Sequence, residues 1–125
     1  MVQRAVPGFC WTSRRNTRAA NPSRFARLDV RDVAAVNMFI GARPRLDVLV
    51  NAAGIARPNA EFDEDTFAEV LDVTLTPQMH LSRAAQPLLA RQGGAIINIA
   101  SMLSHLADAS VSAYCASKTG VLAYA

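Results

Sequence analysis

The chain has 125 residues, of which 51% are hydrophobic and 18% are charged, so it is long enough for one folded domain but not for two. This composition excludes a disordered chain, and no apolar run approaches the length of a membrane span. The net charge of +3 is unevenly placed: residues 1–28 hold six arginines and no acidic residue, and the rest is slightly acidic.

Residues 1–24 have no strong hydrophobic period and are broken by Asn21-Pro22. An arginine-rich segment without acidic residues is compatible with a mitochondrial transit peptide, with binding of nucleic acid or phosphate, or with a poorly ordered tail. Because the segment shows no amphipathic helix and no interleaved aromatic residues, the tail is favoured. We therefore divide the chain into a basic segment, 1–24, and a folded domain, 25–125.

The domain begins with short elements of both kinds. Residues 25–30, FARLDV, predict a short strand that ends at Asp29, and the apolar spacing of residues 31–42 predicts a helix. Residues 46–54, LDVLVNAAG, predict a strand buried on both faces, as in a parallel sheet. This strand runs into small side chains, which allow a ligand to approach the backbone closely.

A long helical period begins near Asp63 and ends at Gly93-Gly94. Pro77 lies inside it and has no N–H to donate, so we expect a kink near residues 73–74. Residues 95–101, AIINIAS, predict a further buried strand that ends at Ser101. This strand is followed by a loop.

The last helix is predicted from about Ser110, with Asp108 or Ser110 as its cap. Within the preceding loop, His105 is interpreted as a solvated histidine, although it could contact a substrate. The two cysteines, Cys10 and Cys115, lack metal or redox spacing and predict reduced thiols in a cytoplasmic protein. Cys115 falls on the apolar side of the helix and is assigned to packing.

The alternation of strand and helix predicts a parallel sheet covered by helices on both faces. In such sheets ligands bind beyond the carboxyl ends of the strands. Asp29, residues 51–54 and Ser101 all follow strands at that edge. Their placement predicts a binding site there.

Tyr114 and Lys118 lie one helical turn apart on the same face of the last predicted helix. An ammonium group beside a phenol favours the phenolate and lowers the tyrosine's pKa, which suits proton transfer at a carbonyl or alcohol oxygen. The hydroxyl of Ser101 could hold that oxygen by a hydrogen bond. The alternative is an ordinary amphipathic stripe that happens to contain both residues.

Four motifs, in order along the chain, together resemble the short-chain dehydrogenase/reductase family in its short form. They are LDV at 28–30, NAAG at 51–54 preceded by LDVLV, INIAS at 97–101 and YCASK at 114–118. The resemblance implies an incomplete Rossmann-like three-layer α/β sandwich, a parallel sheet with helices on both faces. Among short-form members, the chain resembles 3-oxoacyl-carrier-protein reductases and polyol or sugar dehydrogenases.

The resemblance implies hydride transfer between NAD or NADP and a small-molecule carbonyl or secondary alcohol, in a homo-oligomer that needs no metal, nucleic acid or membrane. It makes Tyr114 the general acid/base, Ser101 the residue that orients the substrate oxygen, and Lys118 the residue that lowers the tyrosine's pKa and binds ribose hydroxyls. The cofactor-binding residues that it implies are Asp29, Val30, Asn51, Ala52, Ala53, Gly54, Tyr114 and Lys118.

Three features depart from the family pattern. No glycine-rich turn precedes Asp29, Thr74 stands where the family has an asparagine that serves a proton relay, and the sequence stops at Ala125. Residues 13–15, SRR, are a candidate for the end of a first strand that meets an NADP phosphate. The pattern predicts a central fragment of an oxidoreductase with exposed apolar surface and a tendency to associate.

Two other functions remain open. The first is an inactive fragment that binds a full-length relative through the helices that form the family's dimer interface, with Val70, Leu71 and Met79 as candidate contacts. The second is a nucleic-acid binder that uses the basic segment.

Overall fold

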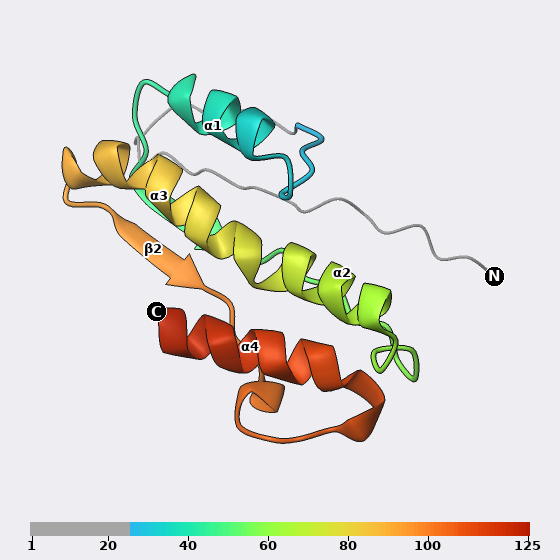
Figure 1. Cartoon of the computed structure of the whole chain (residues 1–125). Helices are drawn as coiled ribbons and strands as arrows, with labels where there is room; N and C mark the ends of the chain where they lie inside the picture. Colours follow the sequence, from blue (N-terminus) through green and yellow to red (C-terminus); the bar gives the residue numbers. More distant parts are fainter. Residues whose placement is uncertain (1–25) are drawn as a thin grey trace.

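The computed structural model describes residues 26–125, which form helices packed beside a small sheet (Figure 1). In chain order the elements are α1 (Val33–Gly41), β1 (Val48–Asn51), α2 (Glu64–Thr74), α3 (Thr76–Ala90), β2 (Ala95–Asn98), the short 3-10 helices η1 (Met102–Ser104) and η2 (Ala109–Val111), and α4 (Ser112–Tyr124). Over these residues, no helix is both long and apolar enough to cross a membrane. The predicted basic segment, 1–24, lies outside the described residues.

The two strands pair in parallel, with Val48 opposite Ala95 and Asn51 opposite Asn98. This pairing confirms the predicted parallel α/β class. Both strands are shorter than the predicted 46–54 and 95–101, because the residues beyond Asn51 and Asn98 turn away to form loops. Their carboxyl ends point the same way, as a site at that edge requires.

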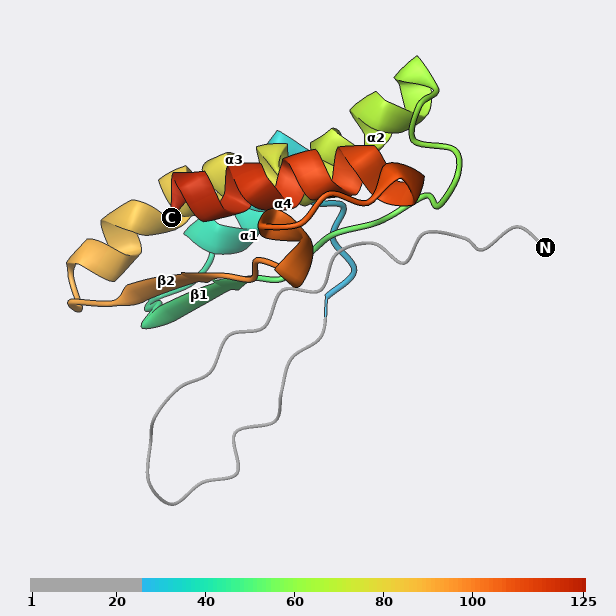
Figure 2. The same cartoon turned by 90° about the horizontal axis from the view of Figure 1, so that it is seen from below.

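The described helices lie on one face of the sheet (Figure 2). On that face, Leu49 of β1 packs against side chains of α1 and α3, and it is 1% exposed. The core of buried apolar residues on this side consists of Leu28, Val30, Val36, Ile40, Leu46, Leu49, Leu81, Ala85 and Leu89. The second helical layer of the expected sandwich is not among the described elements.

The opposite face of the sheet is open in the described part of the chain. Side chains in a strand alternate between faces, so Val50 and its partner Ile97 point away from the helices that cover Leu49. Ile97 is 47% exposed and Ile99 is 43% exposed. The prediction of a buried strand is therefore wrong for β2, whereas the predicted exposed apolar surface is present.

Residues 26–30 form no strand, so the predicted strand at 25–30 is wrong over the described residues. Neither β1 nor β2 pairs with this segment, and a strand exists only where a neighbour completes its hydrogen bonds. Leu28 and Val30 are nevertheless buried in the core. At its end the chain turns, with the amide of Asp32 donating to the carbonyl of Asp29 at 3.1 Å.

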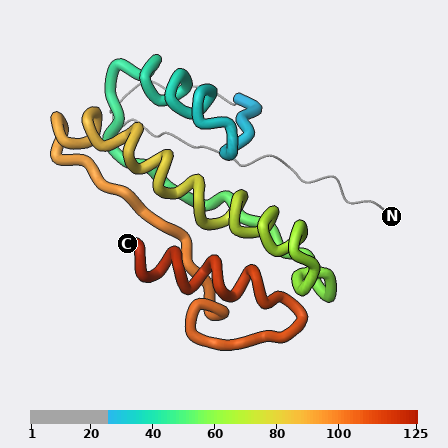
Figure 3. The backbone as a smooth tube through the Cα atoms, viewed as in Figure 1, coloured from blue at the N-terminus to red at the C-terminus, as the bar shows by residue number. Residues whose placement is uncertain are grey.

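The predicted break in the long helix is present, one to two residues later than expected. Helix α2 ends at Thr74 and α3 begins at Thr76, and the two helices follow one another along nearly the same line (Figure 3). Pro77 lies in the first turn of α3, where its missing N–H costs nothing because that position has no helical acceptor. The break sets α2 against α4 while α3 packs on α1.

The start of α4 differs from the predicted cap. Asp108 caps the 3-10 helix η2, accepting hydrogen bonds from the amide and hydroxyl of Ser110 at 2.9 and 2.7 Å. The residue before α4 is Val111, whose side chain cannot accept a hydrogen bond. Cys115 is buried, and His105 is exposed, as the sequence predicted.

Candidate active site

Lys118 joins α4 to the segment that follows β2. Its ammonium donates to the carbonyl oxygen of Ile99 at 2.6 Å, and its side chain is buried. The Nζ atom lies 5.7 Å from the centre of the Tyr114 ring, so the predicted neighbours on the helix face are close in space. Burial lowers the pKa of the Lys118 ammonium, because a charged group loses its hydration there.

Ser101 lies three residues beyond β2 and caps the 3-10 helix η1. Its hydroxyl oxygen accepts a hydrogen bond from the amide of Leu103 at 3.2 Å and keeps its own proton to donate. The backbone of Ser101 is held by Ser104, whose Oγ accepts from the Ser101 amide at 3.1 Å. The hydroxyl of Ser104 also donates to the carbonyl of Lys118 at 2.8 Å.

Ser104 therefore joins the backbones of two predicted site residues, and sequence reasoning overlooked it. The side chain is buried, so both of its hydrogen bonds are shielded from water. A serine three residues after Ser101, at a strand end, is the signature of a reciprocal cap and was the available signal.

Tyr114 lies in the first turn of α4, one turn before Lys118, and is half-buried. Its backbone amide donates to Oε2 of Glu61 at 2.8 Å. Glu61 belongs to the loop that leads into α2, far from Tyr114 in sequence, and was not predicted as a site residue.

The residues that follow β1 lie close to Lys118. A side-chain carbon added to Gly54 would lie 3.3 Å from Cγ2 of Thr74 and 3.8 Å from Cε of Lys118. Asn51 is buried inside the sheet edge and donates to Oδ1 of Asn98 at 2.8 Å, which ties the two strand ends together. Ala52 and Gly54 are exposed, so this backbone is accessible to a ligand.

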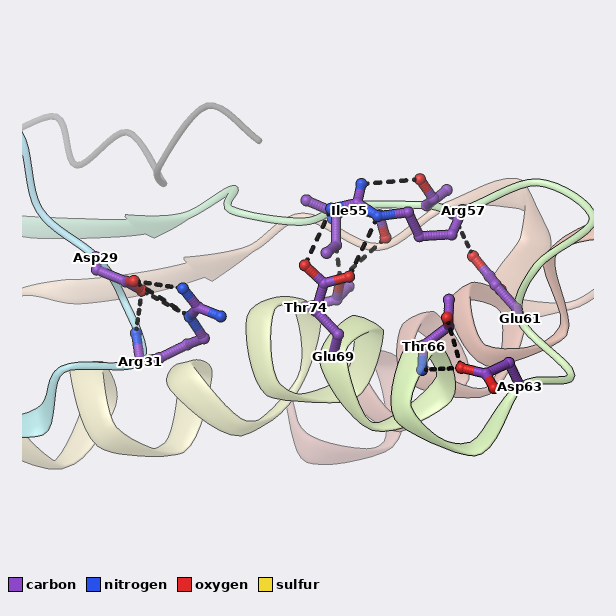
Figure 4. A network of polar contacts seen from close by, with 10 residues as sticks. Asp29, Arg31, Ile55, Arg57, Glu61, Asp63, Thr66, Glu69 and Thr74 are labelled. Atoms are coloured by element: carbon purple, nitrogen blue, oxygen red, sulfur yellow. Dashed lines mark hydrogen bonds and ion pairs between the residues drawn. The ribbon is translucent and has the colours of Figure 1, made fainter. Parts of the chain in front are cut away.

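Thr74 holds the loop that follows Gly54. Its Oγ1 accepts from the amide of Ile55 at 3.1 Å and donates to the carbonyl of the same residue at 3.3 Å (Figure 4). The side chain is fully buried. The threonine thus anchors the loop beside Lys118, a structural role that its side chain performs at the end of α2.

Asp29 and Val30 lie at a different part of this edge. Val30 lines a small cavity together with Ala52, Ala53 and Val73, so it borders the end of β1. The carboxylate of Asp29 turns toward Arg31, which holds it by a 2.6 Å ion pair (Figure 4). Hydrogen bonds from Arg31 lower the pKa of Asp29 to about 2.

The structure thus brings together residues from three strand and helix ends. Gly54, Thr74 and Lys118 are in one cluster, Tyr114 is beside Lys118, and Ser101 is linked to Lys118 through a buried serine. Within residues 26–125, no group of three potential metal ligands gathers. The arrangement offers a phenol, an ammonium group and a hydroxyl at the edge of a parallel sheet.

Comparison with known proteins gives relatives of one kind. Over 103 residues the chain is 42% identical to a hydroxy-methyl-oxo-hexahydroindene-carboxyl-CoA reductase of Mycobacterium tuberculosis, covering 76% of this chain and 39% of that protein. It is 32% identical over 107 residues to a 3-oxoacyl-[acyl-carrier-protein] reductase of Chlamydia pneumoniae, covering 80% and 43%. The chain thus spans about two fifths of the length of these relatives.

A solved structure is similar over the same region. The carveol dehydrogenase of Mycobacterium avium, in complex with NAD, superposes with a TM-score of 0.71 at 27% identity, covering 79% of this chain and 39% of that one. The family model described as short chain dehydrogenase matches residues 12–125. The chain therefore belongs to the short-chain dehydrogenase family, as its four motifs predicted.

Proposed function

We propose that this chain carries the proton-transfer part of a nicotinamide-dependent oxidoreductase, which acts on a small carbonyl compound or secondary alcohol. The observation that carries the proposal is the buried Lys118 ammonium, which is fixed at 2.6 Å to the Ile99 carbonyl and lies beside the Tyr114 ring. In the direction of alcohol oxidation, the oxygen of Tyr114 would accept the proton of the substrate hydroxyl. In the reverse direction the phenol donates a proton to the carbonyl oxygen.

The other residues orient the reacting groups. Ser101 keeps a hydroxyl proton with which to hold the substrate oxygen, and its backbone position is fixed by Ser104. Gly54 and Ala52 leave the end of β1 open next to Lys118. A substrate oxygen held between Ser101 and Tyr114 would thus face the cofactor side of the sheet edge.

The residues present fit the nicotinamide-ribose part of NAD or NADP. Lys118 has three N–H donors, and the contact described for its ammonium uses one, so the others suit ribose hydroxyls. The exposed backbone at Gly54 has no side chain to block a ligand. The bound cofactor would supply hydride transfer. The sequence contains no glycine-rich turn before Asp29 for the pyrophosphate, so we assign no phosphate-binding residues.

Cofactor fluorescence and turnover test this proposal. NADH and NADPH are titrated into the purified chain. Turnover is measured with a 3-oxoacyl substrate, which the Chlamydia pneumoniae relative's name indicates, and with sugar substrates, which the sequence resemblance implies. Tyr114→Phe should leave cofactor affinity within about twofold and lower turnover by a factor of about 10² to 10⁴, the usual range for a lost general acid/base.

The chain provides a matched control, because its only other tyrosine, Tyr124, is exposed at the end of the same helix. Tyr124→Phe should change neither binding nor turnover. Absence of saturable binding at millimolar cofactor would contradict activity of this chain. Equal loss of turnover in both variants would contradict the role of Tyr114.

A further inference from the structure

Glu61 is a buried carboxylate between two parts of the candidate site. It lies in the loop between β1 and α2, and its side chain is 1% exposed. Oε1 accepts from the amide of Arg57 at 2.6 Å, and Oε2 accepts from the amide of Tyr114 at 2.8 Å. One side chain therefore joins the loop that follows Gly54 to the helix that carries Tyr114 and Lys118.

Removing a carboxylate from water is costly, and such groups persist in proteins only where hydrogen bonds compensate. Both oxygens of Glu61 accept backbone N–H groups, a pattern that fits the ionised form. The N-terminus of α4 adds a favourable field, because the first turn of a helix carries partial positive charge. The site of Glu61 is thus built to hold a negative group.

Helix α4 lacks a cap from its own sequence. Val111, at the cap position, has no side-chain acceptor, and Asp108 is occupied at η2. The amide of Tyr114 is one of the first-turn donors that a helix leaves without an intrahelical partner. Glu61, 53 positions earlier in the sequence, supplies the acceptor that a capping residue would normally provide.

A second contact fixes the same pair of segments. The amide of Asn59 donates to the carbonyl of Ser110 at 2.7 Å, just before α4. Asn59 has φ of 64°, a left-handed conformation that asparagine tolerates better than most residues. The loop between Arg57 and Glu61 is therefore shaped to meet the start of α4.

We infer that Glu61 is a positioning residue for Tyr114, which sets where the phenol stands relative to Lys118 and to the end of β1. The inference rests on the proposed function for its catalytic meaning, because the phenol matters only if Tyr114 transfers a proton. The positioning of Tyr114 by Glu61 does not depend on the proposed function, since the hydrogen bond between Glu61 and the Tyr114 amide exists without cofactor or turnover.

Glu69 offers a matched control. Like Glu61 it contacts Arg57, through an ion pair of 3.0 Å between Oε1 and Nη2 (Figure 4). The two side chains of this pair are about one third exposed, and Glu69 makes no described contact with α4. Neutralising Glu69 removes a carboxylate from the same arginine but leaves the amide of Tyr114 untouched.

The test uses the full chain labelled with ¹⁵N and with ¹³C on its tyrosine rings, which gives two ring signals, Tyr114 and Tyr124. Glu61→Gln should speed hydrogen exchange of the Tyr114 amide by about tenfold or more, because the charged acceptor is lost. It should also shift the ring resonance of Tyr114 and leave that of Tyr124 in place. Glu69→Gln should change neither reading.

Glu61→Asp provides a second variant that keeps the charge but withdraws it by one methylene. It should change both Tyr114 signals less than Glu61→Gln does. If Glu61→Gln fails to fold, the test rests on Glu61→Asp compared with wild type. A folded Glu61 variant with wild-type exchange and ring resonance at Tyr114 would overturn the inference, as would equal changes in Glu69→Gln. These readings need no cofactor, so they separate failure of this inference from failure of the proposed function. Where turnover is measured, Glu61→Gln should lower kcat and leave the KM for cofactor nearly unchanged.

Discussion

The two faces of the small sheet differ in whether the described helices cover them. On the helix side, Leu49 is 1% exposed beneath α1 and α3, and the polar residues near Lys118 are linked by hydrogen bonds. On the other side, Ile97 is 47% exposed, and no described element covers it. Leu49 and Ile97, on neighbouring strands, should therefore contribute very different amounts to the free energy of unfolding.

The difference shows which features the described residues determine by themselves. The proposed proton-transfer residues lie on the covered side, and their positions depend on contacts within residues 26–125, including those of Glu61 and Ser104. On the open face, apolar side chains of β2 contact water, and burying them would require additional protein surface to pack against them. The candidate site and the open face can therefore be tested separately.

Leu49→Ala should produce the largest loss of stability, about 2–5 kcal/mol, because it removes buried methyl groups and leaves a cavity in the core. Ile97→Ala, on the open face, should cost less than about 1 kcal/mol, since nearly half of that residue already contacts water. Urea unfolding followed by circular dichroism measures both values. Equal losses would mean that the open face is covered in solution.

The sequence predicted the order of helices and strands, their parallel pairing and the helix break near Pro77, because these follow from apolar periods and one missing N–H. It predicted exposed apolar surface but did not assign that surface to β2. AIINI is an apolar run whose residues favour a buried strand, but burial depends on what packs against it. For the same reason, residues 26–30 have strand-like composition and no strand partner among the described residues.

The motifs proposed Ser101, Tyr114 and Lys118 as site residues because their spacing is local, and the structure brings the last two together. Glu61 could not be predicted in this way. It stands in the acidic stretch EFDED, where a carboxylate is usually solvated, and its partner lies 53 residues away. Contacts of this range become visible only when the loop and the start of α4 are placed in space.

Ser104→Ala should destabilise the fold by about 1–3 kcal/mol, because it leaves the Ser101 amide without its acceptor and removes the buried hydrogen bond to the Lys118 carbonyl. Ser110→Ala is the matched control, since its hydroxyl bonds to exposed Asp108 and its loss should cost less than about 1 kcal/mol. Urea unfolding compares the two. A Ser104 variant as stable as the Ser110 variant would contradict the buried link between Ser101 and Lys118.

Ile97→Lys should weaken self-association of the chain by about tenfold, the equivalent of 1.4 kcal/mol, because a charge interrupts the open apolar face. Met38→Lys on α1 is the control, as Met38 is 73% exposed and lies away from that face. Sedimentation velocity over a concentration series gives the association constants. If the two variants associate equally, the open face is not the surface through which copies meet.

Asp29→Asn should have the smallest effect, and its dependence on pH identifies it. Hydrogen bonds from Arg31 lower the pKa of Asp29 from its usual 3.8 to about 2, so the ionised carboxylate stabilises the fold above about pH 4. That contribution is lost as the pH falls from about 4 through 2, because below the folded-state pKa the carboxylate is protonated in both states. The two side chains are 51% and 44% exposed, so solvent screening keeps the effect below about 1 kcal/mol.

Urea unfolding at pH 6, 4, 3 and 2 should show the stabilities of wild type and variant converging as the pH drops. At pH 6, 1 M salt should narrow the difference in stability between them. A gap that stays constant from pH 6 to 2 would mean that Asp29 acts through packing and not through its charge.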